Sequence, residues 1–164
     1  PNYQIAIFDA YRPIPVQQFM VDYSFAQLAE SKGFPIDKLT ESQRDSLMME
    51  VIKFWAVPSN DPRTPPPHST GAAIDVTLYN EELIEVNMGS PIDEISDRSL
   101  PNYFASSSHS QATAFHRDRQ LLNRVMTYSG FVRHPHEWWH FSYGDQLWAW
   151  TSNQNMAIYG SASA

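Results

Sequence analysis

The sequence contains no cysteine, and this absence limits the kinds of metal site that the chain can build. Any metal bound here must be held by histidine and carboxylate side chains. The redox compartment stays open, because a chain without cysteine is stable in oxidising and in reducing surroundings. We expect a cytoplasmic protein, with the periplasm as the alternative.

Positively charged residues and long apolar runs are also scarce. Lysine and arginine together number 11 against 18 aspartate and glutamate residues, which gives a net charge of −7 at pH 7. This balance argues against a nucleic-acid partner, whose phosphates attract basic surfaces. No apolar run approaches the ~18 residues of a membrane span, so we expect no membrane partner either.

What is present suits one folded domain. The 164 residues are 42% hydrophobic and 13% aromatic, enough for a sizeable core, and we assign 1–164 to a single domain. The chain begins at Pro1, with neither an initiator methionine nor a signal-like apolar region. We interpret this as a trimmed end and expect an N-terminal segment of the parent protein to be missing.

Apolar runs and alternation predict a set of short strands separated by turn residues. We place them at 3–8, 72–79, 83–86, 131–133, 139–143 and 146–150. The first is expected to be buried or half-buried. Together with the helices described next, these strands predict an α+β fold, with a mainly antiparallel sheet that carries helices on one side.

Three helices are expected from apolar positions at helical spacing. The first runs from Pro15 to a stop at Gly33, the second from a capping box at Thr40 to about Trp55, and the third over 112–129. Apolar residues of the first helix are expected in the core: Val16, Phe19, Met20 and Tyr23. The polar, serine-rich stretch 94–110 is expected to be a mobile surface connection.

Two histidines and an aspartate stand out as candidate metal ligands. In a strand over 139–143, alternation places His140 on the opposite face from its aromatic neighbours. Asp75 lies on the polar face of its own strand, and the stiff proline-rich loop before that strand ends at His68. Two histidines and one aspartate with a free position suit catalytic zinc. Glu137 would then lie close enough to accept a proton from the water at that position.

Each of these features has a simpler explanation when taken alone. Glu-x-x-His occurs by chance in many proteins, and a single histidine is more often structural than a ligand. Arg12, just past the first strand, can be a surface partner of Asp9. The residues alone leave these alternatives open.

Four blocks of the sequence resemble the zinc D-alanyl-D-alanine dipeptidase family, which includes the vancomycin-resistance dipeptidase. The clearest is the His-x-x-Gly-x-Ala-x-Asp motif over 68–75. The others follow the family's order, at 9–13, 88–93 and 137–141, and the resemblance extends from Tyr3 to about Trp150. It implies one zinc per chain, bound by His68, Asp75 and His140.

The resemblance also implies roles for residues around the metal. Glu137 would act as general base and acid, and Arg12 would stabilise the oxyanion of the tetrahedral intermediate. Asp93 would hold the substrate's ammonium group, although a turn-forming role fits Asp93 equally well. Trp138 would line the pocket. One departure is Pro66, at a position where the family usually has serine, so any hydrogen bond from that hydroxyl is lost.

The expected function is therefore hydrolysis of D-Ala-D-Ala or a similar small D,D-dipeptide. One alternative is a cell-wall D,D-carboxypeptidase or endolysin of the same superfamily. The other is a non-catalytic zinc-bearing binding module, as in the Hedgehog signalling domain of the same fold. The family also has an N-terminal segment that walls the cleft, which is the segment we expect to be missing here. The resemblance therefore implies that another segment or chain would complete the pocket.

Overall fold

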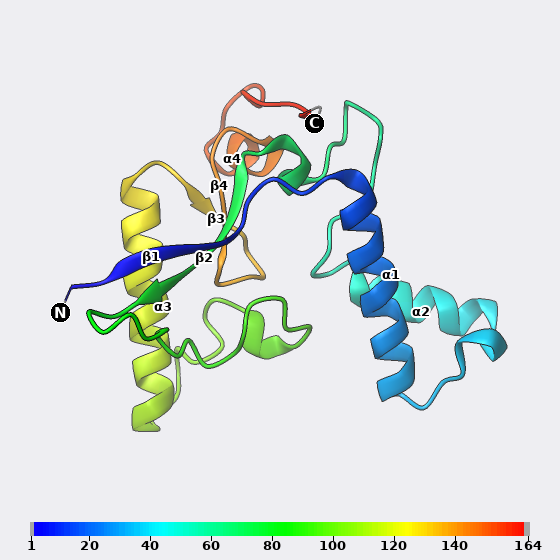
Figure 1. The fold of residues 1–164 in the computed structure, drawn as a ribbon, viewed down its shortest axis with the longest axis horizontal. Helices are drawn as coiled ribbons and strands as arrows, with labels where there is room; N and C mark the ends of the chain where they lie inside the picture. The colour runs from blue at the N-terminus through cyan, green and yellow to red at the C-terminus, as the bar shows by residue number, and fades with distance from the viewer. Residues whose placement is uncertain (1, 163–164) are drawn as a thin grey trace.

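The computed structural model describes residues 2–162, where a four-stranded sheet is accompanied by four α-helices (Figure 1). The strands are β1 (Gln4–Asp9), β2 (Ala73–Tyr79), β3 (Val132–Arg133) and β4 (His140–Ser142). The α-helices are α1 (Ile14–Ser31), α2 (Glu41–Val51), α3 (Ser110–Tyr128) and α4 (Gln146–Thr151). The strands are antiparallel, in the order β1-β2-β4-β3. The predicted α+β class is confirmed.

The register of the central strands sets up the site. Asp75 of β2 pairs with His140 of β4 on one side and with Asp9 of β1 on the other. A bulge between Ile7 and Asp9 interrupts the ladder just before this pair. Directly opposed residues of neighbouring strands have their Cβ atoms about 5 Å apart, so the register brings these three polar side chains into one row.

Two hydrophobic clusters flank this row. The first packs α3 against the sheet and is centred on Val76, Leu78, Leu122, Met126 and Phe141. The second joins α1 to α2 and contains Val21, Phe25, Ala29, Leu47, Val51 and Trp55. Figure 1 shows α3 crossing the strands, whereas α1 and α2 lie together beyond the end of β1. The site therefore lies where two separately packed parts of the chain meet.

The capping box predicted at Thr40 is confirmed, and α2 begins there. Thr40 Oγ1 accepts a hydrogen bond from the Gln43 N–H at 3.2 Å, and Gln43 Oε1 accepts one from the Thr40 N–H at 3.0 Å. The helix is shorter than predicted and ends at Val51. Trp55 nevertheless packs with the second cluster, because the turns after Val51 fold back onto it.

Two predicted strands are wrong. Residues 146–150 form α4, because the Asp145 carboxylate accepts the Trp148 N–H at 2.8 Å and caps a helix there. Residues 83–86 make only a single bridge, between Tyr79 and Glu85. Leu83 has a φ of 58°, in the left-handed region, so this segment turns rather than extends.

The predicted burial of the N-terminal elements is also wrong. β1 is an edge strand, and Ile7 and Phe8 are 66% and 64% exposed. On α1, Phe19 and Tyr23 are more than half exposed, whereas Gln17 and Val21 are buried. Both faces of α1 carry apolar residues, and of the four residues predicted to lie in the core only Met20 packs against the second cluster. Within residues 2–162, no helix is both long and apolar enough to cross a membrane.

Candidate metal centre and active site

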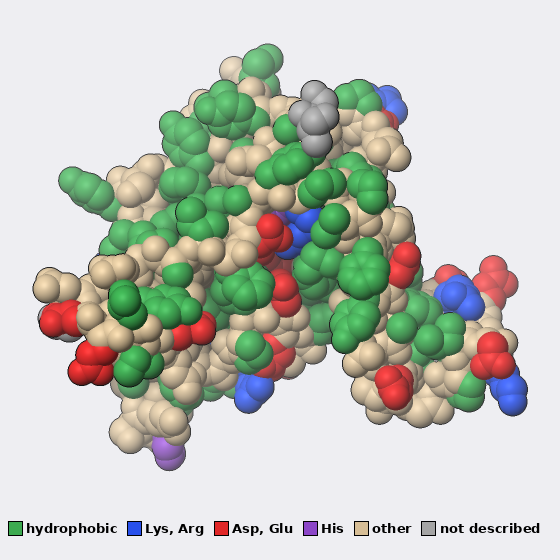
Figure 2. All heavy atoms as spheres, in the orientation of Figure 1, with side chains coloured by type: hydrophobic (Ala, Val, Ile, Leu, Met, Phe, Trp, Pro, Cys, Tyr) green, Lys and Arg blue, Asp and Glu red, His purple; other side chains and the backbone are tan. Residues whose placement is uncertain are grey.

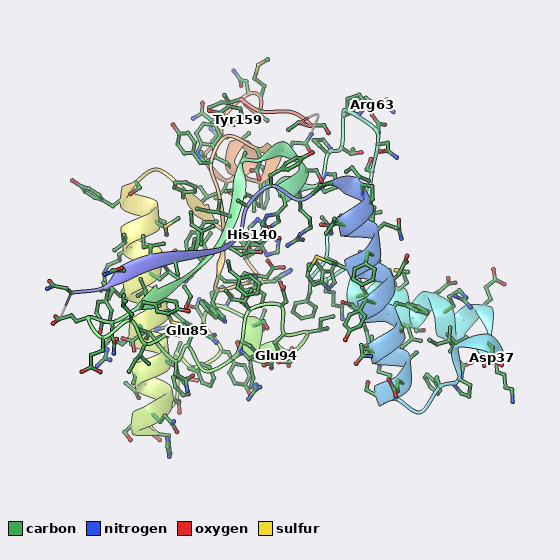
Figure 3. The ribbon with its side chains drawn as sticks, in the orientation of Figure 1. Asp37, Arg63, Glu85, Glu94, His140 and Tyr159 are labelled. Carbon is green, nitrogen blue, oxygen red and sulfur yellow. The ribbon has the colours of Figure 1, made fainter. Side chains whose placement is uncertain are left out.

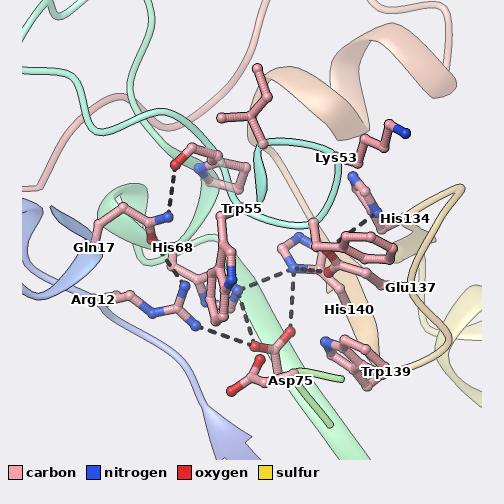
Figure 4. Close-up of a pocket in the computed structure, with 15 residues that line it drawn as sticks. Arg12, Gln17, Lys53, Trp55, His68, Asp75, His134, Glu137, Trp139 and His140 are labelled. Atoms are coloured by element: carbon pink, nitrogen blue, oxygen red, sulfur yellow. Dashed lines mark hydrogen bonds and ion pairs between the residues drawn. The ribbon is translucent and has the colours of Figure 1, made fainter. Parts of the chain in front are cut away.

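Three buried side chains converge at the middle of the sheet. Asp75 and His140 face each other across β2 and β4, and His68 comes from the 3₁₀ turn Pro67–Thr70 that leads into β2 (Figure 4). One ligand atom of each lies within 4.8 Å of the others. Gly71 ends the turn with a φ of 71°, a left-handed conformation that glycine adopts without strain. The structure thus brings together the three predicted metal ligands.

The spacing of the ligand atoms fits a metal ion. His68 Nε2 lies 3.1 Å from His140 Nδ1 and 3.3 Å from Asp75 Oδ2, and His140 Nδ1 lies 3.2 Å from Asp75 Oδ1. Tetrahedral ligands at ~2.0–2.1 Å from zinc are separated by roughly 3.3 Å. His68 Nδ1 lies 2.8 Å from the Ala10 carbonyl, which can only accept, so this nitrogen carries the proton. The lone pair of Nε2 therefore faces the cluster, as metal binding requires.

The charge of Asp75 is held in place by its neighbours. Burial by itself would raise the pKa of Asp75, but the adjacent His140 and His68 imidazoles hold it well below its usual range. The side chain is 3% exposed. Asp75 is therefore ionised at neutral pH, which suits a metal ligand.

Glu137 lies beside this cluster, on the turn that precedes β4. Its Oε2 is 3.5 Å from His140 Nδ1, and its Oε1 is 3.8 Å from His134 Nδ1. The pKa of Glu137 is raised well above its usual value, mainly by burial and next by the negative charges of Asp75 and Asp93. The positive charge of Arg12 opposes this shift. A carboxylate whose pKa is moved toward neutrality can both take up and release a proton near pH 7.

The stretch His136-Glu137-Trp138-Trp139-His140 also has the His-Glu-x-x-His spacing of helical zinc peptidases. On a helix, both histidines would share one face. Here the segment is a turn followed by β4, and His136 is exposed while His140 is buried. His140 therefore has His68 as its histidine partner at the cluster, 3.1 Å away, instead of His136.

Arg12 is buried at the edge of the cluster rather than on the surface. Its Nε donates to Asp9 Oδ2 at 2.8 Å, and its Nη2 lies 3.5 Å from Asp75 Oδ2. The predicted partner, Asp9, is confirmed. The predicted surface position is wrong, because Arg12 is only 3% exposed. Its guanidinium is a fixed positive charge at the pocket wall (Figure 4).

Two residues that the sequence patterns did not indicate hold Arg12 in this position. Gln17 Oε1 accepts from Arg12 Nη1 at 2.9 Å, and Gln17 Nε2 donates to the Ala56 carbonyl at 2.8 Å. The Trp55 ring lies 5.1 Å from the Arg12 guanidinium carbon. Gln17 sits among the buried positions of α1, and a polar residue at a core position was the available signal.

Of the two predicted substrate-binding residues, Asp93 lines the pocket and Trp138 does not. Asp93 has a φ of 64°. The pKa of Asp93 is raised to about 6, mainly by burial and next by the negative charge of Asp75. Trp138 is 1% exposed in the core, where its Nε1 donates to Ser90 Oγ at 2.9 Å. Trp139 lines the pocket instead. The strand begins only at His140, so alternation does not govern the two tryptophans before it.

The pocket carries further groups that sequence analysis did not assign to it. Its other lining residues include His134 and Lys53 (Figure 4). The pKa of His134 is lowered to about 3, mainly by burial and next by the charges of His140 and His136. His134 is therefore neutral at pH 7. Figure 2 shows acidic and basic side chains at the floor of a central hollow that hydrophobic side chains surround. Such a hollow can bind a small molecule that carries both charges.

Comparisons with known proteins agree with this site. The profile of a peptidase family described as D-ala-D-ala dipeptidase matches residues 1–158. The chain belongs to this family. A D-alanyl-D-alanine dipeptidase of Synechocystis is 51% identical over 172 residues, covering 98% of this chain and 70% of the relative. The enzymes of the same name from Escherichia coli and Enterococcus faecalis are 43% and 30% identical and match 84% and 88% of this chain.

Membership of this family confirms the predicted peptidase class. The family is metal-dependent, and His68, Asp75 and His140 form a group that can bind the metal. The chain spans 54% of the Escherichia coli relative and 64% of the Enterococcus faecalis relative.

Proposed function

We propose that the protein is a zinc-dependent dipeptidase that hydrolyses D-Ala-D-Ala. The observation that carries this proposal is the triad of His68, Asp75 and His140, whose ligand atoms lie 3.1–3.3 Å apart beside the buried Glu137. Two imidazoles and one carboxylate with ligand atoms at this spacing would suit zinc better than magnesium or calcium, which prefer oxygen ligands. The names of the relatives support the choice of substrate.

The residues of the site divide the work of peptide hydrolysis between them. When bound, zinc supplies a Lewis acid that activates water and polarises the scissile carbonyl. The Glu137 carboxylate accepts the proton of the attacking water as the new C–O bond forms. Glu137 then passes this proton to the leaving nitrogen as the C–N bond breaks, which releases two molecules of D-Ala. The Arg12 guanidinium faces the oxygen on which negative charge develops.

Asp93 supplies an anion for the substrate's free ammonium group. Its carboxyl group lines the same pocket as Glu137 and Arg12, and the residue is half-buried. The attraction between two opposite charges is stronger in such surroundings than at an exposed surface. An ammonium bound there would place the single peptide bond of the dipeptide beside Glu137.

The pH dependence of substrate capture is expected to follow Asp93. Its pKa of about 6 means that the carboxyl group is neutral below this pH and ionised above it. We therefore expect kcat/KM for D-Ala-D-Ala to rise with pH through about 6, mainly because KM falls. In an Asp93→Asn variant this pH-dependent step should disappear and KM should stay high. A wild-type KM that is flat between pH 5 and 7 would contradict this role.

Release of D-Ala separates the proposed function from its two alternatives. The purified protein with zinc is incubated with D-Ala-D-Ala and, in parallel, with a muramyl pentapeptide that ends in D-Ala-D-Ala. We expect rapid release from the dipeptide and little from the pentapeptide. The reverse preference would indicate a cell-wall carboxypeptidase or endolysin. Calorimetric binding of the dipeptide without any release would indicate a non-catalytic module.

A further inference from the structure

Arg119, on α3, is an arginine buried without a carboxylate partner. Its exposed fraction is 0%. Among residues 2–162, no carboxylate oxygen lies within 4.0 Å of its guanidinium nitrogens. Burial, followed by the charge of Arg133, lowers the pKa of Arg119 to about 10, so it is still charged at neutral pH. Burying such a cation costs free energy unless its donors are satisfied.

The donors of Arg119 are satisfied by one loop, residues 88–100. Its Nε donates to the Met88 carbonyl at 2.7 Å and its Nη1 to the Leu100 carbonyl at 2.9 Å. Its Nη2 donates to the Arg98 carbonyl at 2.9 Å and to Ser90 Oγ at 3.1 Å. The guanidinium thus ties together both ends of the 88–100 loop. Asp93 lies between these ends. Its position in the loop can be found in Figure 3 from the label of its neighbour in the chain, Glu94.

The same guanidinium also reaches the segment that carries Glu137. Ser90 Oγ accepts from Trp138 Nε1 at 2.9 Å as well as from Arg119. The Trp138 N–H donates to the Ser99 carbonyl at 3.1 Å, and the Trp138 ring lies 5.4 Å from the Arg119 guanidinium carbon. Trp138 follows Glu137 directly in the chain. The loop with Asp93 and the turn with Glu137 are therefore fastened to one buried side chain.

The arrangement also explains why residues 94–101 are not the exposed surface connection expected from composition, whereas residues 102–110 are mostly exposed, as expected. Ser99 is fully buried, and its hydroxyl donates to the Glu94 carbonyl. The loop packs closely against α3, because a Cβ at Gly89 would lie 2.6 Å from the ring of Phe115, which is on α3, and 2.5 Å from the ring of Phe104. Asp93 itself has left-handed backbone geometry, with a φ of 64°. For a residue other than glycine this conformation needs support from the surrounding structure.

We propose that Arg119 is a positioning residue for substrate recognition: it holds the 88–100 loop closed so that Asp93 faces the substrate's ammonium group. Arginine suits this task because its planar guanidinium offers five donors in a fixed fork, whereas lysine offers three on a flexible stem. Four of these five donors are used here, by acceptors at four different residues of the loop. The inference rests on the proposed function, in which Asp93 binds that ammonium.

The test compares two substrates that differ only at the amino end, D-Ala-D-Ala and N-acetyl-D-Ala-D-Ala. Wild-type protein should prefer the free dipeptide in kcat/KM by roughly ten- to hundredfold, the size of one hydrogen-bonded charge pair. Arg119→Lys should reduce this preference at least fivefold, and its kcat/KM for the acetylated peptide should fall by less than about threefold. Asp93→Asn should show the same loss. The double variant should be no worse than Asp93→Asn alone.

Controls separate positioning from loss of structure. Arg117→Lys, on the same helix but exposed and paired with Asp118, should keep the wild-type preference. Zinc content and thermal midpoint are measured for every variant. If Arg119→Lys does not fold, Ser90→Ala, which removes the acceptor shared by Arg119 and Trp138, carries the same comparison.

The outcomes distinguish this inference from the function on which it rests. Equal loss of activity on both substrates in Arg119→Lys, with the preference unchanged, would overturn the inference alone and leave Arg119 a purely structural residue. Lack of D-Ala release by the wild-type protein would overturn the proposed function and the inference together. Loss of preference in Arg119→Lys and Asp93→Asn, but not in Arg117→Lys, supports it.

Discussion

Glu137→Gln should lower kcat for D-Ala-D-Ala by about 10²–10⁴-fold, the usual contribution of a positioned general base. The amide has the same shape as the carboxylate but cannot accept the proton of the attacking water. KM should change little, because the substrate's charges are bound elsewhere in the pocket. Zinc content should also be unchanged, since His68, Asp75 and His140 are intact. Steady-state kinetics with metal analysis on the same sample checks this.

Stability of the metal-free protein provides a second measurement on the same variant. In the folded state the pKa of Glu137 is raised, chiefly by burial, so its ionised form is disfavoured relative to the unfolded chain. This destabilisation is absent at low pH and appears as pH rises above the ordinary glutamate value. Glu137→Gln should therefore raise the thermal midpoint at pH 8 but not at pH 4. Glu82→Gln, at an exposed turn, serves as the matched control and should change neither rate nor midpoint.

Arg12→Met should lower kcat by about 10²–10³-fold, as expected when a donor aimed at a developing oxyanion is removed. The methionine fills much of the space against Trp55 but cannot donate to the reacting oxygen. Arg12 also lies 3.5 Å from Asp75 Oδ2, so zinc affinity is measured separately, at saturating zinc for the kinetics. Arg12→Lys should recover part of the rate, because its charge remains.

Arg63→Met is the matched control for this prediction. Arg63 also pairs with an aspartate, Asp61, but it is exposed on a loop away from the pocket. Its replacement should leave kcat unchanged. If Arg12→Met kept more than a tenth of the wild-type kcat at saturating zinc, the oxyanion role would be contradicted.

The part of the site that sequence analysis anticipated depends on short-range regularities. Strand alternation placed Asp75 and His140 on the polar faces of their strands, and the observed register sets them directly opposite each other. His68 was expected to be fixed by the prolines before it, and it lies in a 3₁₀ turn whose first residue is Pro67. Such local rules hold because each ligand sits on, or next to, a regular strand.

The part that was missed depends on side chains that meet across long stretches of sequence. Arg119 bonds mainly to backbone carbonyls 19–31 residues away, and a backbone acceptor leaves no pattern in the amino acids. Gln17 was hidden because α1 carries apolar residues on both faces. The apolar run in 146–150 is compatible with a strand as well as with a helix, and the Asp145 carboxylate caps a helix there.

Titration of the metal-free protein with zinc, followed by the rate of D-Ala release from D-Ala-D-Ala, tests the central claim most directly. The account predicts no release without metal, a linear rise in rate up to one zinc per chain, and a plateau beyond it. His140→Ala should remove both the binding and the rise. Release that is unaffected by complete removal of metal, or no release at one bound zinc per chain, would contradict the account.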